Sequence, residues 1–428
     1  MYIEKLTIRN FRCFGAAEMI LNYPGRKGTP SHPALQRAPN VNLLLGGNGS
    51  GKSSIFKAIA LGVLAPVIPS SGLKAEYFVR RTAGEGSNTA ASVQNGVSSG
   101  NRVPSESAEI KVDLLLEKSD TDLPQPKTIP GQAIIIGQAV ITRRGDVEEI
   151  ATAHTDPPSW DGIYENNSPS FFLAAYGAGR RTERPEGYSE QNRTPRYQRV
   201  AGLFEEQVGL APFTYAYLQL KSRGAFENAR QILNALLIEE NITLTEQQDG
   251  LDRPLFDNNG VLLPFNALSD GYRAFIGWVW DLLLQISRVL PYNATAYRLA
   301  DLSGVVIVDE IDLFLHPAWQ RRVVDQISQA FPKIQFLFSS HSPLVAGTLE
   351  AQSIYVLDSG DNGAVIEQYD ENIFGLTANQ ILTSSYFGLS STRAPDAPQN
   401  DLVRLALSDK EEDHQSFLRR MVKDIPQE

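Results

Sequence analysis

Cysteine and long apolar runs are the scarcest features of this sequence. One cysteine, Cys13, occurs among 428 residues, so the chain can form no internal disulfide and no CxxC metal site. We expect Cys13 to be a core side chain close to the first strand rather than a nucleophile. No stretch approaches the roughly 18 consecutive apolar residues that a membrane-spanning helix requires, and the first residues lack the apolar run of a signal peptide. The sequence therefore predicts a soluble, cytoplasmic protein without a membrane partner.

Positive charge is also in short supply. The chain has 39 Lys and Arg residues against 49 Asp and Glu residues, which gives a net charge of −10. This balance disfavours nonspecific nucleic-acid binding by the whole surface, although a local basic groove can exist on an acidic protein. The arginine clusters that could line such a groove, or that simply face solvent, are Arg143 with Arg144, Arg180 with Arg181 and Arg184, and Arg193 with Arg196 and Arg199.

A glycine-rich loop carries the strongest chemical signal. Gly46 is followed by four residues and then by Gly51-Lys52-Ser53, between a predicted strand at 41–45 and a predicted helix at 52–64. In this motif backbone N–H groups surround phosphate oxygens, the lysine reaches the β- and γ-phosphates, and the hydroxyl binds Mg²⁺. The sequence therefore predicts an ATP site that uses Mg²⁺. The predicted loop contacts are Gly46, Asn48, Gly49, Ser50, Gly51, Lys52, Ser53 and Ser54.

The acidic partner of this loop comes much later in the chain, in the segment VVIVDE at 305–310. Four apolar residues bury the strand and place Asp309 at its carboxyl end, where a carboxylate can hold Mg²⁺ together with Ser53. Adjacent carboxylates repel each other, so a second one is costly unless it does chemistry or forms a salt bridge. We therefore expect Glu310 to act as the general base or to position the attacking water.

The remaining patterns predict an α/β fold in four parts. These are residues 1–196, the first part of an ATPase lobe; 197–264, a compact helical lobe; 265–376, the rest of the ATPase lobe; and 377–428, a helical tail. Long helices are predicted at 271–290 and 318–330, a hairpin or loop at 251–264, and surface loops at 24–39 and 84–107. The predicted strands are 2–9, 41–45, 109–117, 133–143, 170–176, 305–308, 335–338 and 353–357.

Five motifs occur in an order that identifies a family. They are IRNFRCF, GGNGSGKSS, LSDGYR, VVIVDEIDLFLHPAWQ and FLFSSHSPLV, and they frame residues 1 to about 350. As an ordered set they resemble the ABC/SMC-related AAA-type ATPases grouped with RecF, Rad50 and the overcoming-lysogenisation-defect proteins. The branch most similar in appearance is the ATPases of prokaryotic defence systems that have no coiled coil, such as the ATPase subunit of Septu. The resemblance implies an ABC-type P-loop ATPase with mixed sheets and a compact helical lobe in place of a coiled coil.

The resemblance also implies roles for residues outside the phosphate loop. Ser269 and Gly271, in the LSDGY segment at the start of a helix, would contact the γ-phosphate held by a second subunit, although Asp270 departs from the more usual Ser or Gly. Asp312 would lie in the D-loop at the dimer interface, and His341 would be the switch residue that senses the γ-phosphate. Arg12, in the NFR segment, could reach the nucleotide.

The Q-loop is not clearly marked. Gln138 falls in the middle of a predicted strand, which favours an ordinary sheet residue. The segment YGAGRR follows another predicted strand and could take the place of the Q-loop, with Arg180 or Arg181 near phosphate.

The predicted function is that of a dimeric ATPase which senses invading nucleic acid or phage and controls a partner effector, a nuclease or toxin encoded nearby. A nuclease domain within the chain is disfavoured, because 87 residues follow His341 and the pair Asp358 and Asp361 is expected in a turn at a strand end. The alternative is a repair or recombination clamp that binds duplex DNA directly. A transporter subunit is the weakest reading, since the insertion and the FLHPAWQ segment differ from that family.

Overall fold

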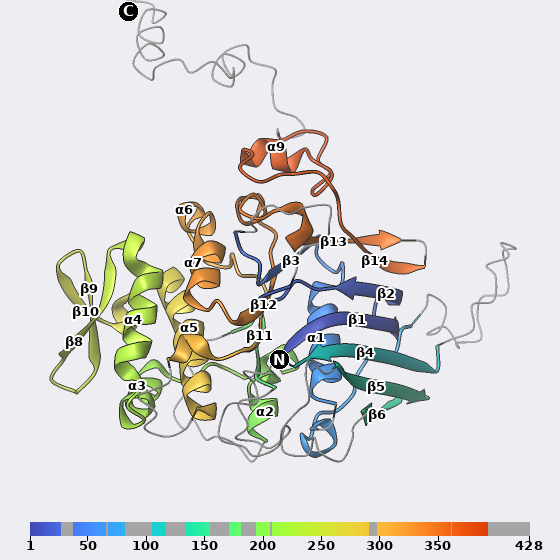
Figure 1. The fold of residues 1–428 in the computed structure, drawn as a ribbon, viewed down its shortest axis with the longest axis horizontal. Helices are drawn as coiled ribbons and strands as arrows, with labels where there is room; N and C mark the ends of the chain where they lie inside the picture. Colours follow the sequence, from blue (N-terminus) through green and yellow to red (C-terminus); the bar gives the residue numbers. More distant parts are fainter. Residues whose placement is uncertain are drawn as a thin grey trace, which may run out of the picture. The chain divides into compact units, whose positions relative to one another are not determined.

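Two β-sheets with a helix between them organise the chain (Figure 1). The computed structural model describes residues 1–26, 37–65, 67–81, 105–116, 134–154, 171–180, 194–205, 208–290, 298–360 and 362–392. Residues 1–388 form one compact unit, and the features below belong to it.

The larger sheet has six strands in the order β14-β13-β3-β12-β11-β7. All neighbours pair in parallel except β13 and β14, which form an antiparallel hairpin. Every residue of β7, β11 and β12 is buried, as expected of a parallel sheet covered on both faces. The strands are β3 (Val41–Gly46), β7 (Leu173–Tyr176), β11 (Gly304–Val308), β12 (Ile334–Ser339), β13 (Ile354–Gly360) and β14 (Gly363–Glu367).

The second sheet is antiparallel and has the order β2-β1-β4-β5-β6. Helix α1 (Lys52–Val63) packs between its inner face and the parallel sheet, so the helix is buried along nearly its whole length. The helix therefore connects the glycine loop to the core of both sheets. The strands are β1 (Tyr2–Phe11), β2 (Phe14–Ile20), β4 (Ser107–Leu115), β5 (Ile134–Arg144) and β6 (Val147–His154).

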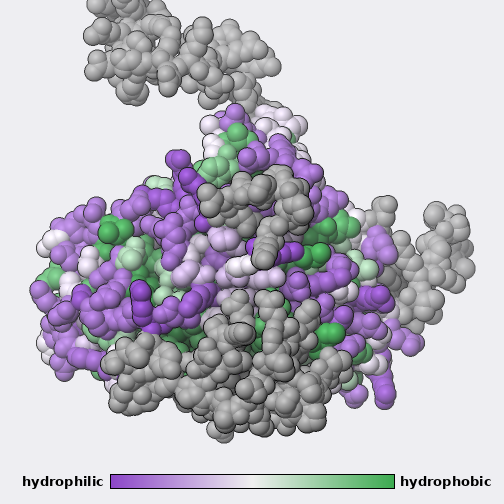
Figure 2. All heavy atoms as spheres, in the orientation of Figure 1, coloured by the Kyte–Doolittle hydropathy of each residue, from purple (hydrophilic) through white to green (hydrophobic). Residues whose placement is uncertain are grey.

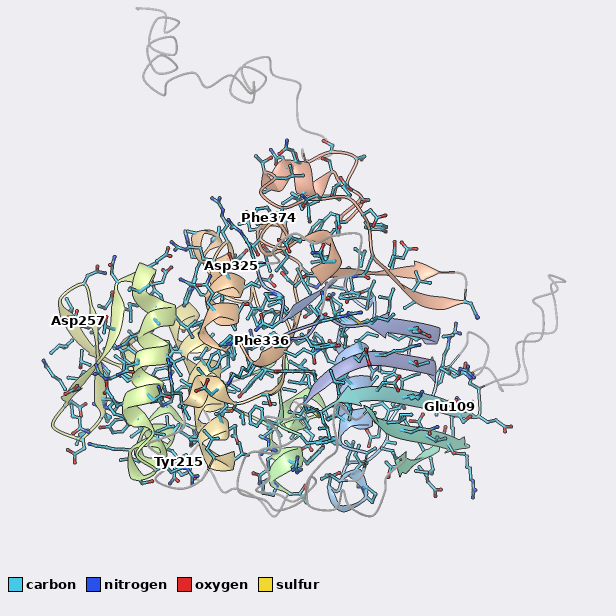
Figure 3. The ribbon with its side chains drawn as sticks, viewed as in Figure 1. Glu109, Tyr215, Asp257, Asp325, Phe336 and Phe374 are labelled. Carbon is cyan, nitrogen blue, oxygen red and sulfur yellow. The ribbon has the colours of Figure 1, made fainter. Side chains whose placement is uncertain are left out.

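Helices and a small sheet cover the other face of the parallel sheet. Phe336 of β12 lies in this interior, whereas Asp257 of β9 and Glu109 of β4 lie towards opposite sides of the view (Figure 3). Trp278 and Trp280 of α5 are each 1% exposed, so the aromatic residues of this helix are core residues, as predicted. The helices are α3 (Phe213–Ser222), α4 (Phe226–Leu237), α5 (Asp270–Val289), α6 (Pro317–Gln320) and α7 (Val323–Ala330), with the short α2 (Pro195–Gln198), α8 (Pro343–Ala346) and α9 (Ala378–Leu382) elsewhere. The small sheet has the order β10-β9-β8, with β8 (Ile242–Gln248), β9 (Pro254–Asn258) and β10 (Val261–Pro264).

The strand order places the chemical motifs at one edge. β12 lies between β3 and β11, and the three strands are parallel. The glycine loop after β3, the acidic pair after β11 and His341 after β12 therefore emerge from neighbouring carboxyl ends, where ligands bind in open α/β sheets.

The predicted α/β fold with mixed sheets is confirmed, with several differences in its elements. β2, β6, β8 and β14 were not predicted; β6, for example, reads VEEIATAH and lies at a sheet edge, so it lacks the apolar run that marks a buried strand. The helix predicted at 318–330 is divided into α6 and α7 at Arg321 and Arg322. The lobe predicted as helical contains α3 and α4 but also the small sheet, and the hairpin prediction for 251–264 is confirmed by β9 and β10. The four-part domain division stays a prediction.

Hydrophilic residues dominate the surface shown in Figure 2, and the hydrophobic ones form small separate groups. None of the helices among the described residues is both long and apolar enough to span a membrane.

Candidate functional site

The glycine loop leaves the first turn of α1 open to an anion. Gly51 is the N-cap of this helix, with φ +109°, and neither a capping side chain nor an acidic residue occupies the first turn. A Cβ on Gly51 would lie 2.6 Å from Cys13 Sγ and 2.7 Å from Phe14 Cζ. The positive φ and these clashes each exclude a side chain at this position. The N–H groups at this helix end therefore have no side-chain acceptor, which is the arrangement that binds phosphate in other proteins.

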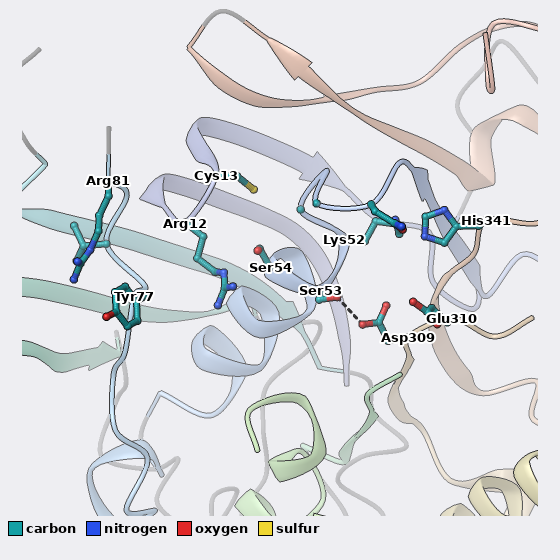
Figure 4. Close-up of a pocket in the computed structure, with 14 residues that line it drawn as sticks. Arg12, Cys13, Lys52, Ser53, Ser54, Tyr77, Arg81, Asp309, Glu310 and His341 are labelled. Atoms are coloured by element: carbon teal, nitrogen blue, oxygen red, sulfur yellow. Dashed lines mark hydrogen bonds between the residues drawn. The ribbon is translucent and has the colours of Figure 1, made fainter. Parts of the chain in front are cut away.

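The two distant motifs meet in a direct hydrogen bond. Ser53 Oγ donates to Asp309 Oδ2 at 2.6 Å (Figure 4), across 256 residues of sequence. Ser339 of β12 donates to the other oxygen of the same carboxylate and accepts the N–H of Glu310 at 2.7 Å. Asp309 is 5% exposed. The two serine hydroxyl groups therefore hold a buried carboxylate in one orientation. Ser339 was not predicted as a site residue.

A hydroxyl beside a carboxylate suits Mg²⁺. This ion takes oxygen ligands and is usually held by one or two protein groups, with phosphates and waters completing its shell. No group of three or more His, Cys, Asp and Glu side chains that could hold a metal occurs in the part of the chain that the structure describes. The oxygens of Ser53 and Asp309 therefore fit Mg²⁺ that arrives with a nucleotide better than a metal held by protein ligands alone.

Lys52 lies folded over the loop. Its Nζ donates to the carbonyl oxygens of Gly46 at 2.8 Å and Gly47 at 3.0 Å. Burial lowers the pKa of Lys52, while the carboxylates of Asp309 and Glu310 act in the opposite direction. A phosphate group at the loop would add negative charge next to this amine and favour its protonated form.

Glu310 and His341 face the same cavity as Lys52 (Figure 4). Glu310 has φ +52°, an uncommon conformation for a residue with a side chain and one that occurs often at functional sites. His341 is exposed at the end of β12. The structure thus places a carboxylate, an imidazole and an ammonium group around one opening.

The cavity has a volume of about 560 Å³ and contains most of the predicted nucleotide residues. The predicted residues that line it are Arg12, Asn48, Gly49, Gly51, Lys52, Ser53, Ser54, Asp309, Glu310 and His341. Residues that line it without having been predicted are Cys13, Tyr77, Val79 and Arg81. No motif marks Tyr77 and Arg81, and the available signal was an aromatic residue followed closely by two arginines in YFVRR.

The prediction for Cys13 was incomplete. Its side chain is half-buried and packs against the core, but it also forms part of the cavity wall beside Gly51. The turn between β1 and β2 carries it there, which the sequence pattern could not show. Burial raises the pKa of this thiol, so the expectation that it is no nucleophile is consistent with its surroundings.

The predicted second-subunit residues do not line the cavity of their own chain. Ser269 is exposed at the N-cap of α5 and makes no capping hydrogen bond. Gly271 lies against the D-loop segment, where a Cβ would come within 2.6 Å of the Phe314 carbonyl oxygen. Asp312 lies in that segment and also stays outside the cavity, as do Gly46 and Ser50 of the glycine loop.

Arg180 takes a position beside the acidic strand. Its guanidinium donates to the backbone carbonyl oxygens of Asp309 at 2.5 Å and Glu310 at 2.9 Å. Burial lowers its pKa to about 10, against the opposing effect of the nearby carboxylates. Arg181 lies outside the described residues.

Gln138 pairs with Lys111 and Ala153 in the middle of the antiparallel sheet, so its interpretation as a sheet residue is confirmed.

Two further readings need correction. Arg196 and Arg199 are buried and donate to the backbone carbonyls of Phe171 and Leu173, so neither a DNA groove nor a solvated face describes them. Arg184 and Arg193 lie outside the described residues, whereas Arg143 and Arg144 are at the end of β5.

Asp358 lies within β13 rather than in a turn, because the hairpin with β14 extends this strand to Gly360. Asp361 lies outside the described residues.

Comparison with known proteins finds AAA domains in two stretches of the chain. Residues 5–149 match a family described as "AAA domain", and residues 194–347 match one described as "AAA domain, putative AbiEii toxin, Type IV TA system". The chain is 25% identical to the Septu protein PtuA of Bacillus mycoides (strain KBAB4) over 395 residues, which cover 91% of this chain and 45% of that protein. The predicted resemblance is confirmed: this chain matches AAA domains in two stretches and is similar to a Septu protein and to retron ATPases.

Other similarities are more limited. The chain is 31% identical over 128 residues to the Retron Ec83 probable ATPase of Escherichia coli, which covers 28% of this chain and 23% of that protein. The chain thus spans less than half the length of the Septu protein and of the retron ATPase. The crystal structure of an SMC head bound to the C-winged helix domain of ScpA gives a TM-score of 0.47 at 15% identity, covering 86% of this chain and 98% of that chain.

Proposed function

We propose that this chain binds ATP with Mg²⁺ and hydrolyses it. The observation that carries the proposal is the hydrogen bond of 2.6 Å between Ser53 Oγ and Asp309 Oδ2, which joins the glycine loop to the acidic strand. Lys52 and Glu310 line the same cavity, so the groups required for phosphoryl transfer converge.

Each group has a distinct task in this proposal. The N–H groups of the loop and Lys52 bind the phosphates, and Ser53 with Asp309 would hold Mg²⁺, which supplies positive charge to the phosphate oxygens when bound. Glu310 takes a proton from water as the water oxygen attacks the γ-phosphorus; the bond to the bridging oxygen breaks and ADP leaves with its electron pair. His341, which lines the same cavity as Glu310, would contact the γ-phosphate.

Hydrolysis in this proposal requires two copies of the chain. Ser269 is exposed at the start of a helix of 20 residues and has no capping bond, so its hydroxyl is open to an anion. Asp270 in the same first turn is paired with Arg273. It does not line the cavity that contains Lys52. A second copy that presents Ser269 and Gly271 to the cavity would complete the site, with Asp312 near the contact.

The relatives support a proposal for the biological role. The similarity to Septu and retron ATPases supports a defence ATPase that senses invading nucleic acid or phage and controls an effector, a nuclease or toxin encoded nearby. Direct clamping of duplex DNA is less well supported, because Arg196 and Arg199 are buried and bind backbone carbonyls. Co-purification from the native operon tests the effector: a stably associated second protein supports it, and a protein that purifies alone with and without ATP contradicts it.

The variant Glu310→Gln tests the chemistry. It keeps the size of the side chain but removes the proton acceptor, so we expect ATP binding to remain while turnover falls by about 10²- to 10⁴-fold. ATP-bound dimers should accumulate, as measured by size-exclusion chromatography with light scattering. Lys52→Ala is the control that should lose ATP binding. Unchanged turnover in a monomeric Glu310→Gln protein would show the proposal to be wrong.

A further inference from the structure

A short arm, residues 75–81, forms one wall of the cavity and is fixed at several points. The Glu148 carboxylate of β6 accepts the N–H groups of Phe78 at 2.7 Å and Val79 at 3.2 Å. The carbonyl of Phe78 accepts the N–H of Arg12 at 2.7 Å, which ties the arm to the end of β1. Glu148 is 8% exposed, so a buried carboxylate holds the arm to the antiparallel sheet.

The arm buries two consecutive side chains and exposes the tyrosine that precedes them. Phe78 and Val79 are buried at 4% and 1% exposure, whereas the Tyr77 side chain is 66% exposed. Tyr77 has φ +57°, which is rare for an aromatic residue. The Arg81 guanidinium carbon lies 4.3 Å from the centre of the Tyr77 ring, so the two side chains stack. Such an exposed, pre-ordered pair offers a flat surface to a ligand.

The stacked pair and the phosphate-binding groups lie at different ends of one cavity. In Figure 4, Arg12 lies between Tyr77 and the Ser53–Asp309 hydrogen bond, and His341 lies on the far side of that bond. A ligand that fills the cavity would therefore have its anionic part at Lys52 and Ser53. Its other part would meet an aromatic ring next to two arginines.

We propose that Tyr77, stacked on Arg81, is the subsite for the nucleobase, an inference that rests on the proposed binding of ATP. Glu148 is a positioning residue, since it holds the backbone directly after Tyr77. The contact is to the face of the base, and every base has such a face. The subsite therefore contributes affinity for nucleoside triphosphates in general rather than selection of adenine.

The test compares ATP with inorganic tripolyphosphate, which has the phosphate chain but no base. Calorimetry on the full chain with Mg²⁺ measures both affinities. Tyr77→Ala should weaken ATP binding by roughly 5- to 150-fold, the effect of losing one stacked base, and leave tripolyphosphate binding unchanged. Tyr77→Phe is the matched control: it keeps the aromatic face and should keep the affinity for ATP.

The Glu148→Gln variant tests the positioning role with the same pair of ligands. Its amide retains one acceptor for the two N–H groups of the arm, so ATP binding should weaken and tripolyphosphate binding should not. A general loss of folding would weaken both ligands alike, which would contradict the positioning role.

The outcomes separate the two proposals. If the wild-type chain binds neither ligand, the proposed ATP function fails. If it binds both, and Tyr77→Ala binds ATP as tightly as the wild type, the base subsite is wrong while the ATP function stands. Weaker binding of both ligands by Tyr77→Ala would also overturn the subsite, because the residue would then act through the phosphate end.

Discussion

Asp309 shows how single residues define the site. Its two carboxylate oxygens accept hydrogen bonds from Ser53 and Ser339, which come from different elements. Ser339 also fixes the N–H of Glu310, whose backbone has a positive φ. The orientation of both acidic residues therefore depends on a serine that does not line the cavity.

Removal of the Ser339 hydroxyl should disturb the chemistry more than the binding of ATP. Ser339→Ala leaves an oxygen of Asp309 and the Glu310 N–H without their partner, which should lower the free energy of unfolding by about 2 kcal/mol. We expect turnover to fall while the affinity for ATP stays close to that of the wild type. Chemical denaturation and a steady-state ATPase assay measure the two effects.

Ser340→Ala provides the matched control. Ser340 is also fully buried, but its hydroxyl accepts the N–H of Ser342 at 2.9 Å and does not contact Asp309. It should lose stability to a similar degree and keep its turnover. Equal losses of turnover in the two variants would contradict the role assigned to Ser339.

At the scale of elements, the end of β7 connects the acidic strand to the long helix. The carbonyl of Tyr176 accepts the N–H of Asp309 at 2.8 Å, and the Tyr176 hydroxyl donates to Asp281 of α5 at 3.0 Å. The other oxygen of Asp281 accepts the N–H of Ala211 at 3.1 Å. One buried carboxylate thus joins the parallel sheet, the helix that begins at the LSDGY segment and the neighbouring lobe.

The charge of Asp281 should make stability depend on pH. Burial raises the pKa of this carboxyl, so the folded chain takes up its proton more readily than the unfolded chain does. The resulting stability is fully present below the ordinary Asp pKa and is lost as the pH rises through the raised pKa. Relative to Asp281→Asn, the wild type should gain free energy of unfolding as the pH falls from the raised pKa towards the ordinary Asp value of about 3.9. Parallel curves for the two proteins in denaturant titrations would show that Asp281 titrates normally.

At the scale of the whole molecule, the proposed composite site draws on two separate faces of the described chain. One is the cavity with Lys52, Asp309 and Glu310, and the other is the start of α5 with Ser269 and Gly271. Ser269 is exposed and lies outside the cavity, so the proposed mechanism brings the two faces together between copies. A mechanism that uses a single copy of the chain and one that uses two copies predict different results when inactive variants are mixed.

Two inactive variants should restore activity when mixed. Lys52→Ala damages the cavity and Ser269→Arg the opposite face, so either protein alone should lack ATPase activity. A mixed dimer retains one intact cavity opposite one intact Ser269, so an equal mixture should recover about a quarter of the wild-type rate. Absence of any recovery, with mixed dimers demonstrated by affinity tagging, would contradict the composite site.

The sequence by itself determined the chemistry and the main elements. The loop from Gly46 to Ser53, the VVIVDE strand and the amphipathic α5 carry their signals in local spacing, because a helix or strand sets the period at which residues share a face. The tertiary structure decided which distant residues support them: Ser339 on Asp309, Arg180 on the acidic strand, and Tyr77 in the cavity wall. Ser339 and Arg180 reach the acidic strand from other segments through single hydrogen bonds, and the fold of residues 75–81 brings Tyr77 to the cavity. Such contacts leave no periodic pattern in the sequence.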